Sequence, residues 1–517
     1  MGQSVGIRVD ARRKQPLHRQ IFDEVVARIE TRTFPPGYKL PPTRVLAREL
    51  AAHRNTVARA YADLEAAGFV SSRVGRGTFV ETWREARPKL AAARDADATR
   101  PELTARDLPW SSLLSSAARS DALARRGPAP LAAAKRDPIN LGRMQPSFDL
   151  IPEPLLRRCI AQALTDHGAR ALGYGTPEGI PRLREQIARD LVARGVPVGA
   201  EDVIVTSASQ QALDLGARSL INPGDAVLVE PTTYAGAIDL FGLAGARLVP
   251  VPVDAEGPDP DALRRLGRPD VKALYLMPNA HNPSGRTLSA ERRRALLNWS
   301  RDAGIPIIED DYAAGLHLEE EAPPPHLRAL DGDVIHVATF SKRLAPGMRI
   351  GYLVAPQQLR AALLPLKRVV DLGASVFLQH AIAEFLERGY LRAHEARTNR
   401  EYRARRDALD AALRRHLPEG ITWDVPRFGV ALWLRLPSSL PPERVYEEAY
   451  RRGVLVGPSA HWSVGARPEP GVRLTFCAEP SERLVEGAKL LGKACKQLLA
   501  DEKVAPPRAT ESSLEMV

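Results

Sequence analysis

With 517 residues, the chain is longer than one hydrophobic core usually supports, so more than one domain is expected. Its 73 lysines and arginines outnumber its 62 acidic residues, and the formal net charge of +11 suits a polyanionic partner without identifying it. The 3 cysteines lie far apart, which argues against a disulfide framework or a zinc site and favours a reducing compartment. No signal-peptide pattern or membrane-length apolar run is present, so we expect a cytoplasmic protein.

The first eighty residues predict a winged helix-turn-helix. A helix over 16–30 carries one apolar stripe, a short helix follows over 43–52, and a second helix spans 55–68. Residues 69–80 predict two short strands joined by a glycine-containing hairpin. A small helical cap with a charged surface is the alternative, but helix, turn, helix and hairpin occur here in the order that DNA binding requires. We therefore predict a DNA-binding domain over 15–82.

Candidate DNA contacts cluster at the start of the second helix of the pair, where side chains and free backbone N–H groups can reach bases and phosphates. These candidates are His53, Arg54, Asn55 and Thr56. Three further arginines are placed for phosphate contacts, namely Arg44, Arg73 and Arg76.

This segment resembles the GntR family of bacterial regulators. The resemblance rests on PLHRQI, PPGYKLP, AYADLEAAG and GRGTFV, and on Arg-x-Thr-Val beginning at Arg54. Two positions depart from the family pattern. Pro42 replaces a small hydroxyl residue, and Ala51-Ala52-His53 replaces a Gly-Val-Ser type of turn. The resemblance implies the winged-helix fold and DNA binding, but it does not identify the operator sequence.

The rest of the chain divides by composition. Residues 83–138 are rich in Ala, Arg, Pro and Ser and predict a linker, in which 109–123 is the stretch suited to one short helix. Strands then alternate with amphipathic helices over 139–500, which predicts an α/β domain with a mostly parallel sheet. Residues 501–517 predict a disordered tail.

A lysine stands in a short polar loop between two apolar, strand-like runs, 334–340 and 349–355. The amine of this residue, Lys342, could form a Schiff base with an aldehyde, while nearby hydroxyls and a guanidinium could hold a phosphate dianion. The phosphate-binding candidates beside it are Thr339, Ser341 and Arg349. A surface lysine and arginine on an ordinary βαβ connection would explain the loop almost equally well.

Two more candidate groups follow predicted strands. Ser209 and Gln210 open a helix after the strand 203–206, where free N–H groups and the helix dipole make a seat for an anion. An ordinary Ser/Thr N-cap is the alternative at this turn. Tyr234, after the strand 226–231, could stack on a pyridine ring or simply pack in the core.

The next two strands end in polar residues. Asn282 follows the strand 272–278 and could donate to a ring phenolate. Asp310 and Tyr312, two residues apart, project from one face of the strand 305–312. A carboxylate on a ring nitrogen keeps that nitrogen protonated, so the ring can withdraw electrons. The neighbouring Asp311 is the competing candidate, although strand parity points it the other way.

These motifs occur in the order found in fold-type I pyridoxal-phosphate enzymes of the class I aminotransferase group, which the chain resembles. The lysine segment fits S/T-x-S-K-x-L-x-P-G-x-R-x-G-Y from Thr339 to Tyr352, whereas Ala208 stands where a glycine is common. The resemblance implies that Lys342 forms the Schiff base with pyridoxal 5′-phosphate and that Asp310 meets the ring nitrogen. It implies these other cofactor contacts: Ser209, Gln210, Thr339, Ser341 and Arg349 at the phosphate, Tyr234 over the ring, Asn282 and Tyr312 at the phenolate, and Tyr174 at the phosphate of the partner subunit.

The resemblance further implies that Arg473 binds the α-carboxylate of an amino acid in a bidentate pair. A GntR-type winged helix followed by an aminotransferase-like domain is the architecture of the MocR subfamily. It implies a homodimeric transcription regulator that uses the cofactor, free or reacted with an amine or amino-acid effector, as its signal. The alternative is a working aminotransferase with an accessory DNA-binding domain. The sequence identifies neither the effector nor the operator, nor whether the protein activates or represses.

Overall fold

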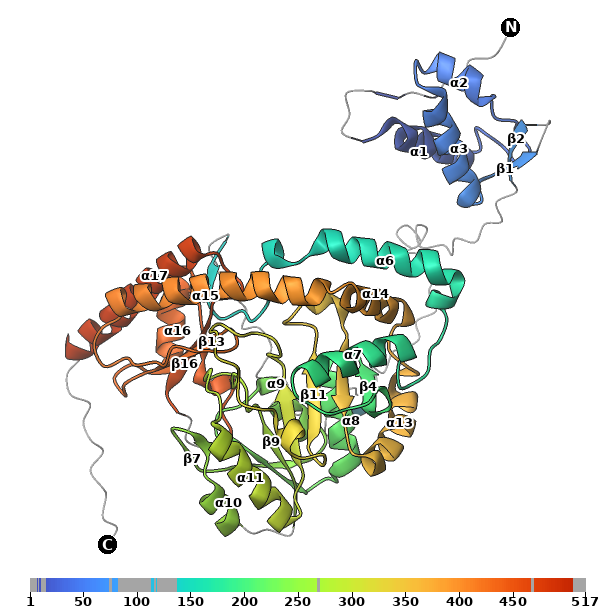
Figure 1. Ribbon diagram of the computed structural model, residues 1–517. Helices are drawn as coiled ribbons and strands as arrows, with labels where there is room; N and C mark the ends of the chain where they lie inside the picture. Colours follow the sequence, from blue (N-terminus) through green and yellow to red (C-terminus); the bar gives the residue numbers. More distant parts are fainter. Residues whose placement is uncertain are drawn as a thin grey trace. The chain divides into compact units, whose positions relative to one another are not determined.

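The computed structural model describes residues 7, 9–10, 15–73, 77–81, 113–115, 118, 137–266, 270–465 and 469–504. The chain forms two compact units, 1–113 and 114–517 (Figure 1). Most of the predicted linker, the helix expected over 109–123 and most of the predicted tail lie outside the described residues. No helix in the described part of the chain is both long and apolar enough to cross a membrane.

The first unit is a winged helix-turn-helix, as predicted. It consists of α1 (Leu17–Glu30), α2 (Thr43–Glu49), α3 (Arg54–Ala66) and the antiparallel hairpin β1 (Val70–Arg73) and β2 (Gly77–Val80). Its core is built on the predicted apolar stripes, and Ile21, Val25, Val57 and Leu64 are fully buried. The helix predicted over 43–52 ends early, because Ala51 takes a positive φ of 49° that no α-helix continues.

The second unit is organised around a seven-stranded sheet. The strand order is β4 (Val203–Thr206), β12 (Gly351–Val354), β11 (Ile335–Thr339), β10 (Ile307–Asp311), β9 (Val271–Leu276), β5 (Ala226–Val229) and β6 (Arg247–Pro250). Only β12 runs antiparallel to its neighbours, so the prediction of a mostly parallel sheet is confirmed. Because β11 and β12 are antiparallel, the lysine loop between them is a tight return and not part of a βαβ crossover.

Both faces of this sheet are covered, which is why its strands read as continuous apolar runs. Residues on one face, such as Ile308 and Leu353, join the core shared with α8 (Ala208–Leu220) and α9 (Ala235–Leu243). Residues on the other face, such as Val205 and Tyr352, join the core shared with α7 (Pro181–Ala193) and α14 (Val376–Glu387). Further helices and short elements complete the layers: η2 (Phe148–Leu150), α6 (Glu153–His167), η3 (Gly168–Leu172), η4 (Ala200–Asp202), β7 (Val253–Asp254), β8 (Gly257–Pro258), α10 (Pro260–Leu266), α11 (Ala290–Ala303), α12 (Leu327–Leu330), η5 (Pro346–Met348) and α13 (Gln357–Asp371).

A smaller subdomain follows the 27-residue helix α15 (Tyr390–His416). Figure 1 shows α15 reaching from α14 to α17 (Ser481–Val504), against which it packs. The subdomain has an antiparallel sheet of β13 (Ala431–Arg435), β16 (Gly471–Thr475) and β15 (Gly457–Pro458). Its remaining elements are α16 (Pro442–Arg451), η6 (Ser459–His461) and the parallel pair β3 (Ile139–Asn140) and β14 (Val454–Leu455). The helix α15 therefore connects the sheet that carries Lys342 with the sheet that carries Arg473.

Candidate functional site

A cavity of about 180 Å³ gathers the candidate residues of the large domain. It receives side chains from the ends of β10 and β11, the start of α8 and strand β16. Its lining consists of Met144, Ala208, Ser209, Gln210, Tyr234, Asn282, Asp310, Tyr312, Thr339, Ser341, Lys342, Arg349 and Arg473. Every predicted site residue of this domain is therefore in the cavity except Tyr174.

Lys342 enters the cavity from the tight turn after β11, and its Nζ donates a hydrogen bond to the carbonyl oxygen of Met144 at 2.5 Å. Burial lowers the pKa of Lys342, and the nearby cations Arg473 and Arg349 act in the same direction, against an opposing effect of Cys477. A lowered pKa increases the fraction of neutral amine, which is the nucleophilic form. Lys342 is thus suited to attack an aldehyde carbon.

One end of the cavity is formed by the first turn of α8 and the strand end before Lys342. The side chain of Ser207 makes no capping bond to α8, so the ordinary N-cap alternative is not what the structure has. Thr339 and Ser341 lie with their hydroxyl oxygens 3.0 Å apart. Arg349 is exposed and donates to the carbonyl oxygen of Ser207 at 3.4 Å. Helix N–H groups, hydroxyls and a guanidinium together suit a phosphate dianion.

The backbone at this end is crowded. Ala208 has a positive φ of 69°, a conformation that favours glycine. Gly351 faces it, and a Cβ at position 351 would lie 2.7 Å from the Cα of Ala208. The absence of a side chain on Gly351 lets β12 pass beside the strained turn.

Asp310, the penultimate residue of β10, lines the cavity. Its Oδ2 accepts a hydrogen bond from the hydroxyl of Tyr275 at 2.8 Å, but its Oδ1 is buried without a partner among the described residues. Burial raises the pKa of Asp310 to about 7. Asp311 points to the opposite side of the strand, where Asn279 donates to it at 3.4 Å. An N–H donor in the cavity would satisfy Asp310 and not Asp311.

Arg473 closes the other end of the cavity. Its guanidinium donates to Asn282 Oδ1 at 2.9 Å and to the carbonyl oxygen of Gly142 at 2.6 Å, and it lies 4.3 Å from the ring centroid of Trp462. Burial lowers the pKa of Arg473 to about 10. Among the ion pairs between described residues, none involves Arg473, so its charge has no acidic partner there. A carboxylate entering the cavity would supply the missing anion.

Two tyrosines complete the cavity. The Tyr234 hydroxyl donates to Gln210 Oε1 at 3.2 Å, and the Tyr312 hydroxyl donates to the carbonyl oxygen of Ala280 at 2.6 Å. Burial raises the pKa of Tyr234 to about 12 and also raises that of Tyr312, so both remain neutral donors.

In the first unit, α3 presents the predicted DNA-contact residues at its N-terminus. Arg54 and Asn55 are exposed, Thr56 is half-buried, and His53 caps the helix by accepting the Asn55 N–H at 3.3 Å. Arg44, on α2, is exposed as well. Arg73 lies at the end of β1, while Arg76 lies outside the described residues.

Comparison with known proteins agrees with both units. Residues 136–489 match the family of class I and II aminotransferases, and residues 17–80 match the bacterial regulatory proteins of the gntR family. A relative from Rhizobium meliloti, the probable rhizopine catabolism regulatory protein MocR, is 32% identical, over 96% of this chain and 97% of its own length. The chain belongs to the MocR-type GntR regulators.

Two further proteins are similar to this MocR-type chain, one a regulator and the other an aminotransferase of known structure. The HTH-type transcriptional regulator TauR of Rhodobacter capsulatus is 32% identical over 90% of this chain and 93% of its own length. The alpha-aminoadipate aminotransferase LysN of Thermus thermophilus has a crystal structure in complex with N-(5′-phosphopyridoxyl)-L-leucine. It matches with a TM-score of 0.69 and 30% identity over 76% of this chain and 100% of its own. The second unit therefore has the aminotransferase fold.

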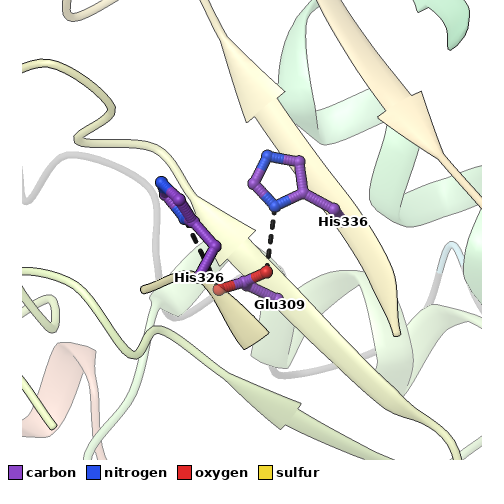
Figure 2. A group of neighbouring side chains, drawn as sticks. All are labelled: Glu309, His326 and His336. Carbon is purple, nitrogen blue, oxygen red and sulfur yellow. Dashed lines mark hydrogen bonds and ion pairs between the residues drawn. The ribbon is translucent and has the colours of Figure 1, made fainter. Parts of the chain in front are cut away.

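A buried group next to Asp310 was not predicted from the sequence. Figure 2 shows Glu309 between His326 and His336, with ring nitrogens of both facing the carboxylate at 3.7 and 3.0 Å. Three such ligands could hold a metal ion. The carboxylate, however, already accepts two backbone N–H groups at the start of α12, at 2.9 and 3.1 Å. Burial would raise the pKa of Glu309, but its hydrogen bonds to the two histidines hold that pKa well below its usual range. The group fastens β10 to β11 and α12.

The winged-helix unit of this MocR-type protein contains a strained backbone turn at Ala51, and its effect on stability can be measured. Ala51 has a φ of 49°, where glycine is favoured, so Ala51→Gly is expected to stabilise the first unit by about 0.5–1 kcal/mol. Calorimetric unfolding of the two proteins would measure the difference. Ala52→Gly is the matched control, because Ala52 has no positive φ and gains nothing from glycine. A lower unfolding temperature for Ala51→Gly would show that the turn is not strained.

Tyr174 does not reach the cavity of its own chain. Its side chain is 91% exposed, and other large apolar residues that are also exposed include Phe148, Leu172 and Val369.

Proposed function

We propose that this protein is a transcription regulator that binds pyridoxal 5′-phosphate at Lys342 and responds to an amine or amino acid. One observation carries the proposal. A single cavity holds a lysine of lowered pKa, a buried carboxylate oxygen without a partner and a buried guanidinium without an anion. These three groups match an aldehyde, a ring N–H and an effector carboxylate.

When bound, pyridoxal 5′-phosphate supplies an aldehyde that amines capture and a ring that withdraws electrons. Lys342 would hold it covalently, and Asp310 would accept a hydrogen bond from the ring nitrogen. Tyr234 would cover the ring, and Asn282 and Tyr312 would face its phenolate oxygen. The phosphate would be held by Ser209, Gln210, Thr339, Ser341 and Arg349. Arg473 would bind the carboxylate of an amino-acid effector.

A working aminotransferase is the competing function. The aromatic-amino-acid aminotransferase 1 of Thermococcus litoralis is 34% identical over 70% of this chain, and the cavity contains the residues that such chemistry needs. Turnover decides between the two functions. We expect the loaded protein to convert amino acids to keto acids far more slowly than the ~10 s⁻¹ typical of enzymes, while the same amino acids change operator binding. Rapid multiple turnover with no effect on DNA binding would favour the enzyme.

DNA binding is expected to depend on the start of α3. Arg54→Ala should weaken operator binding by about 1–3 kcal/mol if Arg54 contacts a base edge. Wild-type affinity should fall with salt, with a log–log slope of about −0.9 per phosphate neutralised. Mobility-shift titrations at several salt concentrations would measure both effects. Arg19→Ala is the control, because Arg19 is an exposed arginine on α1 that pairs with Asp23 and is not among the predicted DNA contacts. Equal affinities for Arg54→Ala and wild type would refute this placement.

We expect the protein to be a homodimer in which Tyr174 of the partner subunit completes each phosphate site. Mixing Tyr174→Ala chains with Lys342→Ala chains gives a direct test. Each parent should bind the cofactor poorly. The mixed dimer should regain one tight site, in which Lys342 comes from one chain and Tyr174 from the other. Titration of absorbance and sedimentation would measure binding and assembly. A monomer that binds the cofactor tightly would contradict the arrangement.

A further inference from the structure

The residue after Lys342 points away from the cavity into a buried junction of charged groups. Arg343 is only 2% exposed, although arginine is rarely buried. Its Nε donates to Glu395 Oε1 at 2.6 Å, and its two terminal nitrogens donate to the two oxygens of Asp190 at 2.8 and 3.1 Å. Neither acid lies near it in the sequence, since Asp190 belongs to α7 and Glu395 to α15. Three separate parts of the chain therefore meet at this guanidinium.

A second arginine completes the junction. Arg194, which follows α7, donates to Asp190 at 3.3 Å and to Glu395 at 3.1 Å, so two cations share two acids. Burial alone would lower the pKa of Arg343, but the charges of Asp190 and Glu395 raise it well above its ordinary value. Burial would likewise raise the pKa of Asp190, yet Arg343 and Arg194 hold it at about 2. The junction thus pairs two arginines with two acidic residues, so its formal charges balance.

The loop that follows Asp310 and Tyr312 rests on the same junction. Gly315 has a φ of 76°, and a Cβ there would lie 2.3 Å from Glu395 Oε1. Asn399, one turn further along α15, donates to the carbonyl oxygen of Gly315 at 2.8 Å. The junction therefore contacts both the turn that carries Lys342 and the loop that follows Asp310 and Tyr312.

We infer that Arg343 is a positioning residue that fixes the reach of Lys342 toward the cofactor by fastening its turn to α7 and α15. The fork geometry is what this role requires. The two parallel N–H···O bonds to Asp190 set the angle of the guanidinium, and the bond from Nε to Glu395 sets its distance from α15. A lysine at the same place would keep the charge but would lose the fixed geometry. The inference rests on the proposed cofactor binding at Lys342.

The variant Arg343→Lys tests this role, with Arg194→Lys as its matched control. Both substitutions leave the charge balance intact and remove a guanidinium from the same two acids, but only position 343 is next to Lys342. We expect Arg343→Lys to raise the dissociation constant for pyridoxal 5′-phosphate about 10–100-fold, as displaced reactive groups do. We also expect it to shift the midpoint of the pH titration of the visible band. Arg194→Lys should change both by less than about twofold, whatever its effect on the unfolding temperature.

The outcomes distinguish a failure of the proposed cofactor binding from a failure of the positioning role of Arg343. A wild-type protein that captures no pyridoxal 5′-phosphate would refute the proposed function. If the wild type captures it and the two variants behave alike, the junction is structural only and the positioning role is wrong. Should Arg343→Lys fail to fold, Glu395→Gln is the replacement. It weakens the bond to Nε while leaving the fork on Asp190, and the same loss of cofactor affinity is expected. Unchanged cofactor affinity in folded Glu395→Gln would also overturn the inference.

Discussion

Lys342→Ala protein is expected to bind operator DNA as tightly as the wild type while losing both covalent capture of pyridoxal 5′-phosphate and the transcriptional response to effector. The two losses follow from one missing amine, because alanine cannot bond to the aldehyde. DNA binding should survive because α3 and its hairpin belong to a separate compact unit. Visible absorbance, borohydride trapping with peptide mapping, mobility shift and a reporter assay would measure the four quantities.

Lys342→Arg is the control for charge. Arginine retains a cation in the cavity but cannot make the covalent bond, so it should fail in the same assays as Lys342→Ala. A response retained by arginine and lost by alanine would mean that the cation, and not the bond, carries the signal. A typical coupling of about 1–3 kcal/mol between the effector site and DNA would then be purely electrostatic. A normal reporter response in both variants would refute any signalling role for Lys342.

Local patterns were sufficient to predict the parts of the site that lie on single segments. Strand parity placed Asp310 and Tyr312 on one face and Asp311 on the other, because β10 is regular up to Asp311. The lysine loop could be read from its motif alone. The direction of the strand after the loop could not be read in this way. The alternative of a βαβ connection is wrong because β12 runs antiparallel to β11.

The residues that hold the site residues in place could not be predicted from local sequence patterns. Arg343 was not singled out from the sequence, because its partners Asp190 and Glu395 lie 153 and 52 positions away in the chain. Trp462 and Gly142, which hold Arg473, likewise come together with it only through folding. Glu309 gave one usable signal. It is the first of three consecutive acids at the end of a buried strand, and a buried carboxylate must find donors. The identity of those donors required the tertiary structure.

Asp310→Asn is expected to remove a large pH dependence from the stability of the cofactor-free protein. Burial raises the pKa of Asp310 from 3.8 to about 7 in the folded state, so the folded protein holds this proton more tightly than the unfolded chain does. The resulting contribution of Asp310 to the free energy of unfolding is complete below about pH 4 and is lost as the pH rises to about 7.

At about 1.4 kcal/mol per pKa unit, the wild type should lose up to ~4 kcal/mol relative to Asp310→Asn between these limits. Urea unfolding of both proteins at pH 5 and pH 8, without cofactor, would measure the difference. Asp311→Asn, on the opposite face of β10, is the matched control. The charge of Asp311 adds to the effect of burial on Asp310, so this variant should reduce the loss but not remove it. Saturation of the wild type with pyridoxal 5′-phosphate should abolish it, because a ring N–H facing Oδ1 favours the ionised carboxylate and lowers its pKa. If the stability gap between wild type and Asp310→Asn stays constant from pH 5 to pH 8, Asp310 does not hold a proton in the empty cavity. The fit between this carboxylate and a ring nitrogen would then lose its electrostatic basis.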